Sequence, residues 1–232
     1  MARFRLDRAV VVVLLAVSAF LTARAWLHDH PQHNPWAPLD LNDPPGWATQ
    51  AKLAGLRDDP AECRAVLKRS GVAFSALEPP GEGECLRPDR ITLDKLPIAG
   101  RAEMTCALGA GLALWERRVQ PLAETMLGSR IARIEHFGTF SCRRVYGRST
   151  GNWSEHSTGN AIDVAGFVLA DGRRVTVAAD WKDAGKDAAF LHHARDEACE
   201  IFGTVLSPDY NAAHADHLHL DQAARGWGGY CR

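Results

Sequence analysis

The strongest constraint on this chain is an apolar segment at its N-terminus that follows three arginines. The run AVVVVLLAVSAFLTA fills residues 9–23 without interruption, and Arg24 closes it. A basic start followed by such a run is typical of a secretory signal or a signal anchor. Because positive charge stays on the cytoplasmic side, the rest of the chain is expected outside the cytoplasm. Ala23-Arg24-Ala25 has the form of a cleavage site, so residues 1–27 are interpreted as a signal peptide or an N-terminal membrane anchor.

A proline-rich stretch follows the apolar segment. Residues 28–47 read HDHPQHNPWAPLDLNDPPGW, with five prolines and no hydrophobic period. This composition favours a semi-extended tether. Its histidines, at positions 28, 30 and 33, are interpreted as solvated because nothing in such a segment fixes metal-ligand geometry. The folded domain is therefore expected over residues 48–232, an ordinary size for one domain.

Charge and composition exclude several classes of protein. Lys and Arg number 27 against 28 Asp and Glu, and 46% of the residues are hydrophobic. The near balance of charge excludes a nucleic-acid binder that works through bulk positive charge, so no nucleic-acid partner is expected. The apolar fraction excludes disorder of the whole chain.

The six cysteines are expected to form disulfides once the chain is outside the cytoplasm. They are widely spaced and contain no C-x-x-C pair, which argues against a zinc knuckle or a redox motif. Spacing alone does not choose among the possible pairings. Pairing by order along the chain gives the working prediction of Cys63–Cys85, Cys106–Cys142 and Cys199–Cys231.

Hydrophobic spacing predicts helices early in the domain and an antiparallel sheet later. The expected helices cover residues 60–70, 103–126 and 187–202, and the expected extended segments cover 91–96, 131–142, 160–168, 173–179 and 217–221. Asp171-Gly172 marks a hairpin turn between two of these strands. This order predicts an α+β fold with helices packed on a small antiparallel sheet, rather than a parallel α/β fold.

Two polar clusters carry the residue types of a metal site. Strict alternation in the last predicted strand places His217, His219 and Asp221 on one face and leucines on the other. Asp163 can project from a neighbouring strand, and His156 from the loop before it. Each alone would be an ordinary polar residue, or one that caps a core. Together, two imidazoles and a carboxylate would form a three-ligand zinc site with an open fourth position, as in catalytic zinc sites.

The spacing of these residues also resembles that of known families. S-x-H-x-x-G-x-A-x-D over residues 154–163, followed by H-x-H at 217–219, resembles the metallopeptidase clan of D-Ala-D-Ala carboxypeptidases, murein endopeptidases and the Hedgehog signalling domain. More narrowly, the chain from about Cys63 onward resembles the bacterial extensin-like C-terminal domain family. The matching segments are SEHSTGNAIDVAGF, FGTVLSPDYN and HADHLHLD. The clan resemblance implies a Hedgehog- or DD-peptidase-like form of the α+β fold.

The resemblance assigns roles to individual residues. It implies Zn²⁺ as cofactor, with His156, Asp163 and His219 as ligands. It implies His217 as general base or transition-state stabiliser, and Arg143 as a group facing the substrate and the developing oxyanion. The remaining polar residues of the motifs are expected beside the metal or the substrate; they are Ser154, His214 and Asp221.

One position departs from the carboxypeptidase branch of the clan. That branch carries a glutamate two residues before its last ligand histidine, where this chain has His217. Glu155 neighbours a predicted ligand but is interpreted as a solvated charge, because it would point away from the face that His156 uses.

These features predict a zinc-dependent peptidase-like protein of the periplasm or cell envelope. It would hydrolyse an amide bond in peptidoglycan stem peptides or cross-links. The alternative is a non-catalytic metal-containing module that binds peptidoglycan or an envelope partner, which the missing glutamate favours. The expected partners are a peptidoglycan peptide and, if the N-terminal segment is uncleaved, the inner membrane.

Overall fold

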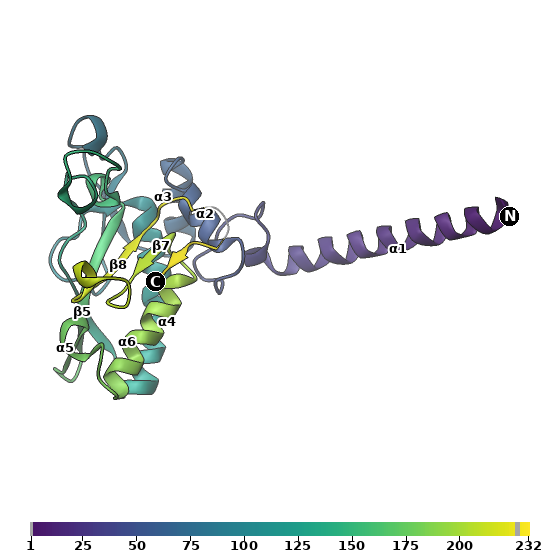
Figure 1. Cartoon of the computed structure of the whole chain (residues 1–232). Coiled ribbons are helices and arrows are strands. Elements are labelled where there is room, and N and C mark those ends of the chain that lie inside the picture. The colour runs from purple at the N-terminus through teal and green to yellow at the C-terminus, as the bar shows by residue number, and fades with distance from the viewer. Residues whose placement is uncertain (1, 226–227) are drawn as a thin grey trace.

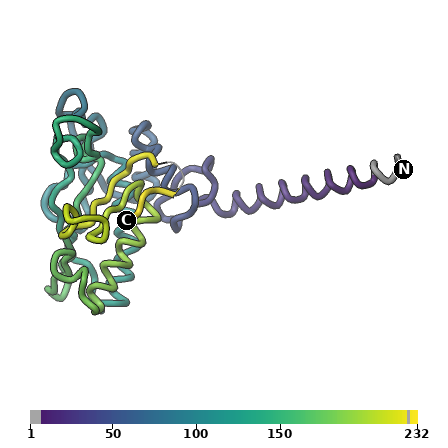
Figure 2. The backbone as a smooth tube through the Cα atoms, in the orientation of Figure 1, coloured from purple at the N-terminus to yellow at the C-terminus, as the bar shows by residue number. Residues whose placement is uncertain are grey.

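A long N-terminal helix projects from a folded body in the computed structural model, which describes residues 2–225 and 228–232 (Figure 1). Helix α1 spans Ala2–Asp29 and projects from the body, which it meets at its C-terminal end, as the backbone trace also shows (Figure 2). Its segment Asp7–Asp29 is long and apolar enough to cross a membrane, and none of it is buried. The structure therefore agrees with an N-terminal segment that can serve as a signal anchor.

The segment that follows α1 is docked on the body rather than extended from it. Leu39 and Leu41 are buried in the core. The guanidinium of Arg69 donates to the Leu39 carbonyl at 3.1 Å, and that of Arg117 to the Leu41 carbonyl at 2.9 Å. Part of the predicted tether, residues 28–47, thus belongs to the folded body. Proline content indicated an extended backbone, but the arginines that hold its carbonyls come from distant helices.

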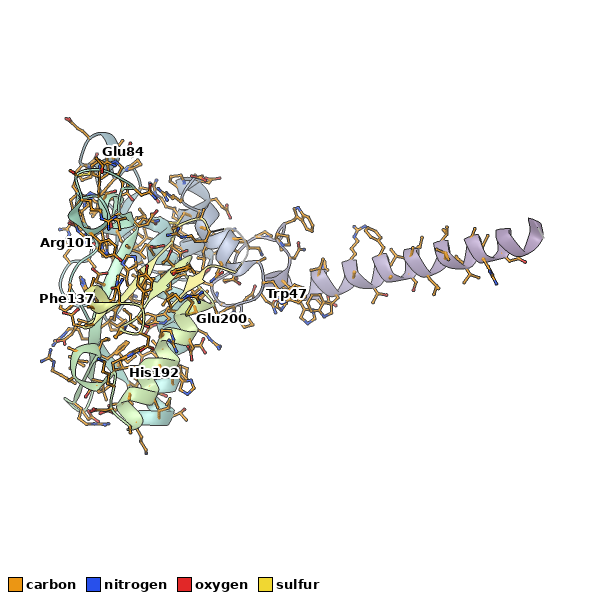
Figure 3. The ribbon with its side chains drawn as sticks, in the orientation of Figure 1. Trp47, Glu84, Arg101, Phe137, His192 and Glu200 are labelled. Atoms are coloured by element: carbon orange, nitrogen blue, oxygen red, sulfur yellow. A yellow bond between two sulfur atoms is a disulfide. The ribbon has the colours of Figure 1, made fainter. Side chains whose placement is uncertain are left out.

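The histidines that follow α1 pack against tryptophan rings, so their side chains are not fully solvated. The rings of His30 and His33 stack on Trp26 at centroid distances of 4.4 and 5.2 Å, and Trp47 lies 4.6 Å from His33. Figure 3 shows Trp47 at this junction between helix and body. The short 3-10 helix η1 (Pro31–His33) lies within the same turn of chain.

The core is built around the long helix α4 (Cys106–Leu127). The Thr105 hydroxyl accepts a hydrogen bond from the Leu108 amide at 3.2 Å and caps its N-terminus, and Gly128 ends it with φ +72°. Trp115 is fully buried and its indole N–H donates to the Ala194 carbonyl at 2.8 Å. The other helices are α2 (Thr49–Gly55), α3 (Pro60–Arg69), the short α5 (Val177–Asp180) and α6 (Lys186–Cys199).

Two sheets complete the α+β fold, which confirms the predicted class. The smaller is antiparallel, with strands β1 (Phe74–Ala76), β2 (Arg90–Leu93) and β3 (Met104–Thr105). The larger contains β4 (Ile131–His136), β5 (Ala161–Leu169), β6 (Arg174–Thr176), β7 (Thr204–Leu206), β8 (Leu218–Asp221) and β9 (Tyr230–Cys231). Its order is β4-β5-β8-β7-β9, with β6 also paired to β5, and β7–β9 is a parallel pair. The strands of two or three residues were too short for hydrophobic alternation to reveal most of them.

The register between β5 and β8 decides where polar side chains meet. Asp163 lies directly opposite His219 in this antiparallel pair. Leu218 and Leu220 are fully buried in the core, as their alternation predicted. Since opposite residues share a face, the carboxylate and the imidazole project together from the other side of the sheet.

Three disulfides staple the body, and two differ from the pairing predicted by order. Cys63 bonds to Cys106, and Cys85 to Cys142. The third bond joins Cys199 to Cys231, as pairing by order along the chain predicted. Pairing by order fails because α3 packs on α4, so that Cys63 meets the first residue of α4 rather than its nearest cysteine in sequence.

Peptide mapping under non-reducing conditions tests these pairings. We expect linked peptides that contain Cys63 with Cys106 and Cys85 with Cys142. Replacing Cys63 and Cys106 together by alanine removes a link between positions 43 residues apart, which should lower the free energy of unfolding by about 4 kcal/mol through the greater entropy of the unfolded chain. Peptides linking Cys63 to Cys85 would contradict the structure.

Candidate metal centre

A tight turn carries the first imidazole of the site. His156 lies in the 3-10 helix η4 (Glu155–Thr158). The Ser154 hydroxyl caps this turn by accepting a hydrogen bond from the His156 amide at 3.3 Å. Gly159 ends the turn with φ +74°, a conformation that favours glycine, and the chain then enters β5. Ser154 thus positions His156.

Three electron-rich atoms converge where η4 meets β5 and β8. His156 Nε2 lies 3.1 Å from Asp163 Oδ1 and 3.2 Å from His219 Nδ1. His219 Nδ1 lies 3.0 Å from the same Asp163 oxygen. The three predicted ligands therefore come together, with His156 almost fully buried.

The outer nitrogens of both imidazoles fix which nitrogen faces this cluster. His156 Nδ1 is 3.2 Å from the Thr139 carbonyl, and His219 Nε2 is 3.0 Å from Asp221 Oδ2. A carbonyl and a carboxylate only accept, so these outer nitrogens donate and each neutral ring turns a lone pair inward. Carboxylate or carbonyl partners of this kind are typical behind metal-binding histidines.

Two inward lone pairs and a carboxylate oxygen require a positive charge among them. Burial alone would raise the pKa of the Asp163 carboxyl, but hydrogen bonds with His156 and His219 hold that pKa well below its usual value. Burial alone would lower the pKa of His219, but Asp163 and Asp221 raise it to about 9. In the metal-free protein, a proton on His219 supplies the charge that a cation would otherwise supply.

The separations of the donor atoms suit a zinc ion. Tetrahedral zinc bound by nitrogen and oxygen at about 2.0–2.1 Å holds its ligand atoms roughly 3.3 Å apart. The three observed separations of 3.0–3.2 Å are close to that value. Two histidines and one carboxylate are also a donor set found in catalytic zinc sites. The residues present therefore fit the ion.

Two further histidines of the motif stand beside the cluster. His217 Nε2 lies 3.5 Å from Asp163 Oδ1, while its Nδ1 is 2.8 Å from Asp216 Oδ1. The His214 ring lies 5.2 Å from the His217 ring, and its Nδ1 is 2.8 Å from Asn211 Oδ1. Burial, followed by the charges of His217 and His219, lowers the pKa of His214 to about 4. His214 is therefore neutral at physiological pH.

Arg143 and Glu155 occupy different surroundings. Arg143 is exposed and lines the cleft in front of the cluster, and its guanidinium has no ion pair with any described residue. The Glu155 carboxylate accepts from the Asn160 amide at 2.7 Å and pairs with Arg57 at 3.2 Å. Glu155 is thus a braced structural group and not the solvated charge that was predicted.

The cluster forms part of the wall of a cleft of about 880 Å³, a volume that suits a short peptide. One side is an arm of chain, residues 143–154, that carries Tyr146 and Trp153. Tyr146 has the strained φ of +56°, and its hydroxyl accepts a hydrogen bond from the Asn211 side chain at 3.0 Å. Sequence reasoning missed this aromatic lining, because nothing in the pattern shows which exposed aromatics meet. The region GRSTGNW offered only a loop signal.

The outer edge of the site faces away from the N-terminal helix. Phe137 is exposed and packs edge-on against His217 at a centroid distance of 5.8 Å. In Figure 3, Phe137 lies on the side of the body remote from Trp47, where α1 joins. If α1 spanned a membrane, that membrane would therefore not cover the side of the site that carries Phe137.

Comparison with known sequences identifies one family. The sequence model described as Extensin-like protein C-terminus matches residues 61–232. No curated protein and no solved structure matches the chain.

Metal analysis of the purified full-length chain tests the cluster. We expect one zinc ion per chain, and His156→Ala and Asp163→Asn should each lower zinc content to background because each removes a donor atom. His192→Ala is the matched control, since His192 stacks on Trp181 outside the cleft. Unchanged zinc content in His156→Ala would contradict this assignment.

The pH dependence of stability gives a second test. A histidine with a pKa of about 9 in the folded state and about 6.5 when unfolded stabilises the fold below pH 6.5 and loses that effect as pH rises through 9. The free energy of unfolding of the metal-free chain should therefore fall from pH 6.5 to 9, as measured by urea titration. His219→Gln should flatten this fall, and a stability that rises over the same range in the metal-free chain would refute the assignment.

Proposed function

This chain belongs to the family of extensin-like protein C-termini, and we propose that its folded domain is a zinc-dependent hydrolase of the cell envelope. Its substrate would be an amide bond in peptidoglycan stem peptides or cross-links. The observation that carries the proposal is the convergence of three donor atoms within 3.2 Å of one another at the wall of a peptide-sized cleft. His217 stands beside that cluster as a group able to move a proton.

His156, Asp163 and His219 would hold the ion. Bound zinc supplies Lewis-acid chemistry, polarising a carbonyl and lowering the pKa of water toward about 7. Asp221 contributes by keeping the His219 ring in the tautomer that turns Nδ1 inward. Thr139 does the same for His156 through its carbonyl.

His217 is the proton-transfer group in this proposal. Because its Nδ1 donates to Asp216, its Nε2 carries the lone pair and faces the Asp163 side of the cluster. Nε2 accepts a proton from the attacking water and returns it to the nitrogen of the departing amine. His217 thus fills the place that a glutamate fills in the carboxypeptidases that the motif resembles.

Arg143 and His214 complete the polar lining. The guanidinium of Arg143, which pairs with no carboxylate among the described residues, is available to donate to the carbonyl oxygen as negative charge develops there. His214 is neutral with Nδ1 held by Asn211, so its Nε2 offers an acceptor to a substrate N–H.

The N-terminal helix and the three disulfides support a location in the cell envelope. An apolar segment of this length directs export or anchors a chain. All six cysteines are bonded, as is typical of proteins from oxidising compartments. A peptide substrate in the wall would be within reach of such a protein.

Incubation of the full-length chain with zinc and muropeptides tests the proposal, with new amines detected by mass spectrometry. We expect cleavage by the wild type and a loss of about 100-fold or more in kcat for His217→Ala, with zinc content unchanged. His192→Ala should cleave like the wild type.

Cleavage by neither wild type nor control, in preparations shown to contain zinc, would overturn the hydrolase proposal. If such preparations still bound muropeptides, the result would favour the alternative of a non-catalytic, metal-containing binding module. Equal rates for His217→Ala and wild type would remove His217 from its proposed role.

A further inference from the structure

The floor of the cleft continues past the metal cluster onto the next strand. In the antiparallel pair β7–β8, Thr204 lies opposite Asp221 and Leu206 opposite His219. Opposite residues share a face of the sheet, so Thr204 and Leu206 lie on the same side as the cluster. Both line the cleft. A ligand bound at the cluster can therefore extend across β8 and over β7.

An arginine stands at this far end of the cleft. Arg225 follows β8 and lines the cleft, and its Nε donates to the Thr204 hydroxyl at 3.0 Å. Thr204 is only 3% exposed, so the packing of β7 holds the hydroxyl that contacts Arg225 in place. Arg225 has no ion pair with any residue in the described part of the chain, and its terminal nitrogens are free to bind a ligand.

The balance of charge in the cleft is positive at this end. Arg57 is paired with Glu155, and the carboxylates of Asp163 and Asp221 are engaged by the imidazoles of the cluster. A divalent ion would offset those two negative charges. Among the described residues of the cleft lining, the guanidinium groups of Arg143 and Arg225 then remain uncompensated.

We propose that Arg225 binds a carboxylate of the substrate, so that the cleft selects an anionic peptide. A guanidinium binds a carboxylate through two parallel hydrogen bonds, which fixes both position and orientation. The contact with Thr204 leaves the terminal nitrogens for this purpose.

The sheet geometry sets the spacing of the bound carboxylate from the metal cluster. Neighbouring strands are about 4.8 Å apart and alternate residues of one strand about 6.8 Å apart, which places Thr204 roughly 10 Å from the cluster. An extended peptide covers that span in about three residues. The bound carboxylate is therefore expected about three residues from the bond at the cluster. The identity of that bond rests on the proposed function, whereas carboxylate binding does not require cleavage.

Binding to the full-length, zinc-loaded chain in detergent tests this proposal by calorimetry; the wild type at Arg225 and every variant also carry His217→Ala, so that the peptide binds without being cleaved. The probes are the stem peptide L-Ala-γ-D-Glu-L-Lys-D-Ala-D-Ala, a form with the D-glutamate carboxylate amidated and a form with the C-terminal carboxylate amidated. We expect one amidation to weaken binding about tenfold, which identifies the carboxylate involved. Arg225→Gln should bind the unmodified peptide as weakly as the wild type binds that amide.

Matched variants separate this role from a general effect of charge. Arg225→Lys should retain part of the preference for the unmodified peptide, because lysine keeps the charge but loses the paired hydrogen-bond geometry. Arg130→Gln is the control, since Arg130 pairs with Glu124 away from the cleft and should bind like the wild type. Equal binding of all three peptides by the wild type, or an undiminished preference in Arg225→Gln, would overturn the proposal. A preference that depends on Arg225, together with no cleavage of peptide by the chain that retains His217, would support carboxylate binding by Arg225. That result would contradict only the proposal that the chain is a hydrolase.

Discussion

The central constraint on the site is that the fold holds three electron-rich atoms close enough to repel one another. His156 Nε2, Asp163 Oδ1 and His219 Nδ1 lie within 3.2 Å of one another in a largely buried position. Their outer hydrogen bonds prevent the rings from turning away. A positive charge among the three atoms removes the repulsion, and either a proton or a cation can supply it. Low dielectric surroundings make this requirement stronger than it would be in water.

The rest of the body holds those atoms in place. Strand β8 lies between β5 and β7 and pairs with both. These two pairings link the cluster to the far end of the cleft. Beneath it, α4 and α6 bury the apolar faces of the strands (Figure 1). The Cys85–Cys142 bond links η2 (Gly83–Cys85) to the segment that leads into the cleft arm. Apolar burial beneath the sheet and the disulfide crosslink offset the cost of the crowded polar cluster.

Much of the fold and the cluster could be predicted from sequence because both follow simple periods. Alternation over residues 217–221 predicted the leucines of β8 in the core and His217 and His219 on the open face, and the helical spacing of α4 was equally clear. The disulfides near Cys63 and the docking of Leu41 could not be predicted, because each depends on which distant segments pack together. Arg225 was missed for the same reason, since its only signal is proximity to Thr204 across the sheet.

X-ray absorption at the zinc edge of the zinc-loaded, full-length chain identifies the atoms that bind the ion. Binding by His156, Asp163 and His219 should give nitrogen and oxygen ligands at about 2.0–2.1 Å, with scattering from two imidazoles. Replacing His156 by alanine should remove one imidazole from that signal or abolish binding. Sulfur ligands at about 2.3 Å, or an unchanged spectrum in His156→Ala, would contradict the assignment of His156, Asp163 and His219 as the metal centre.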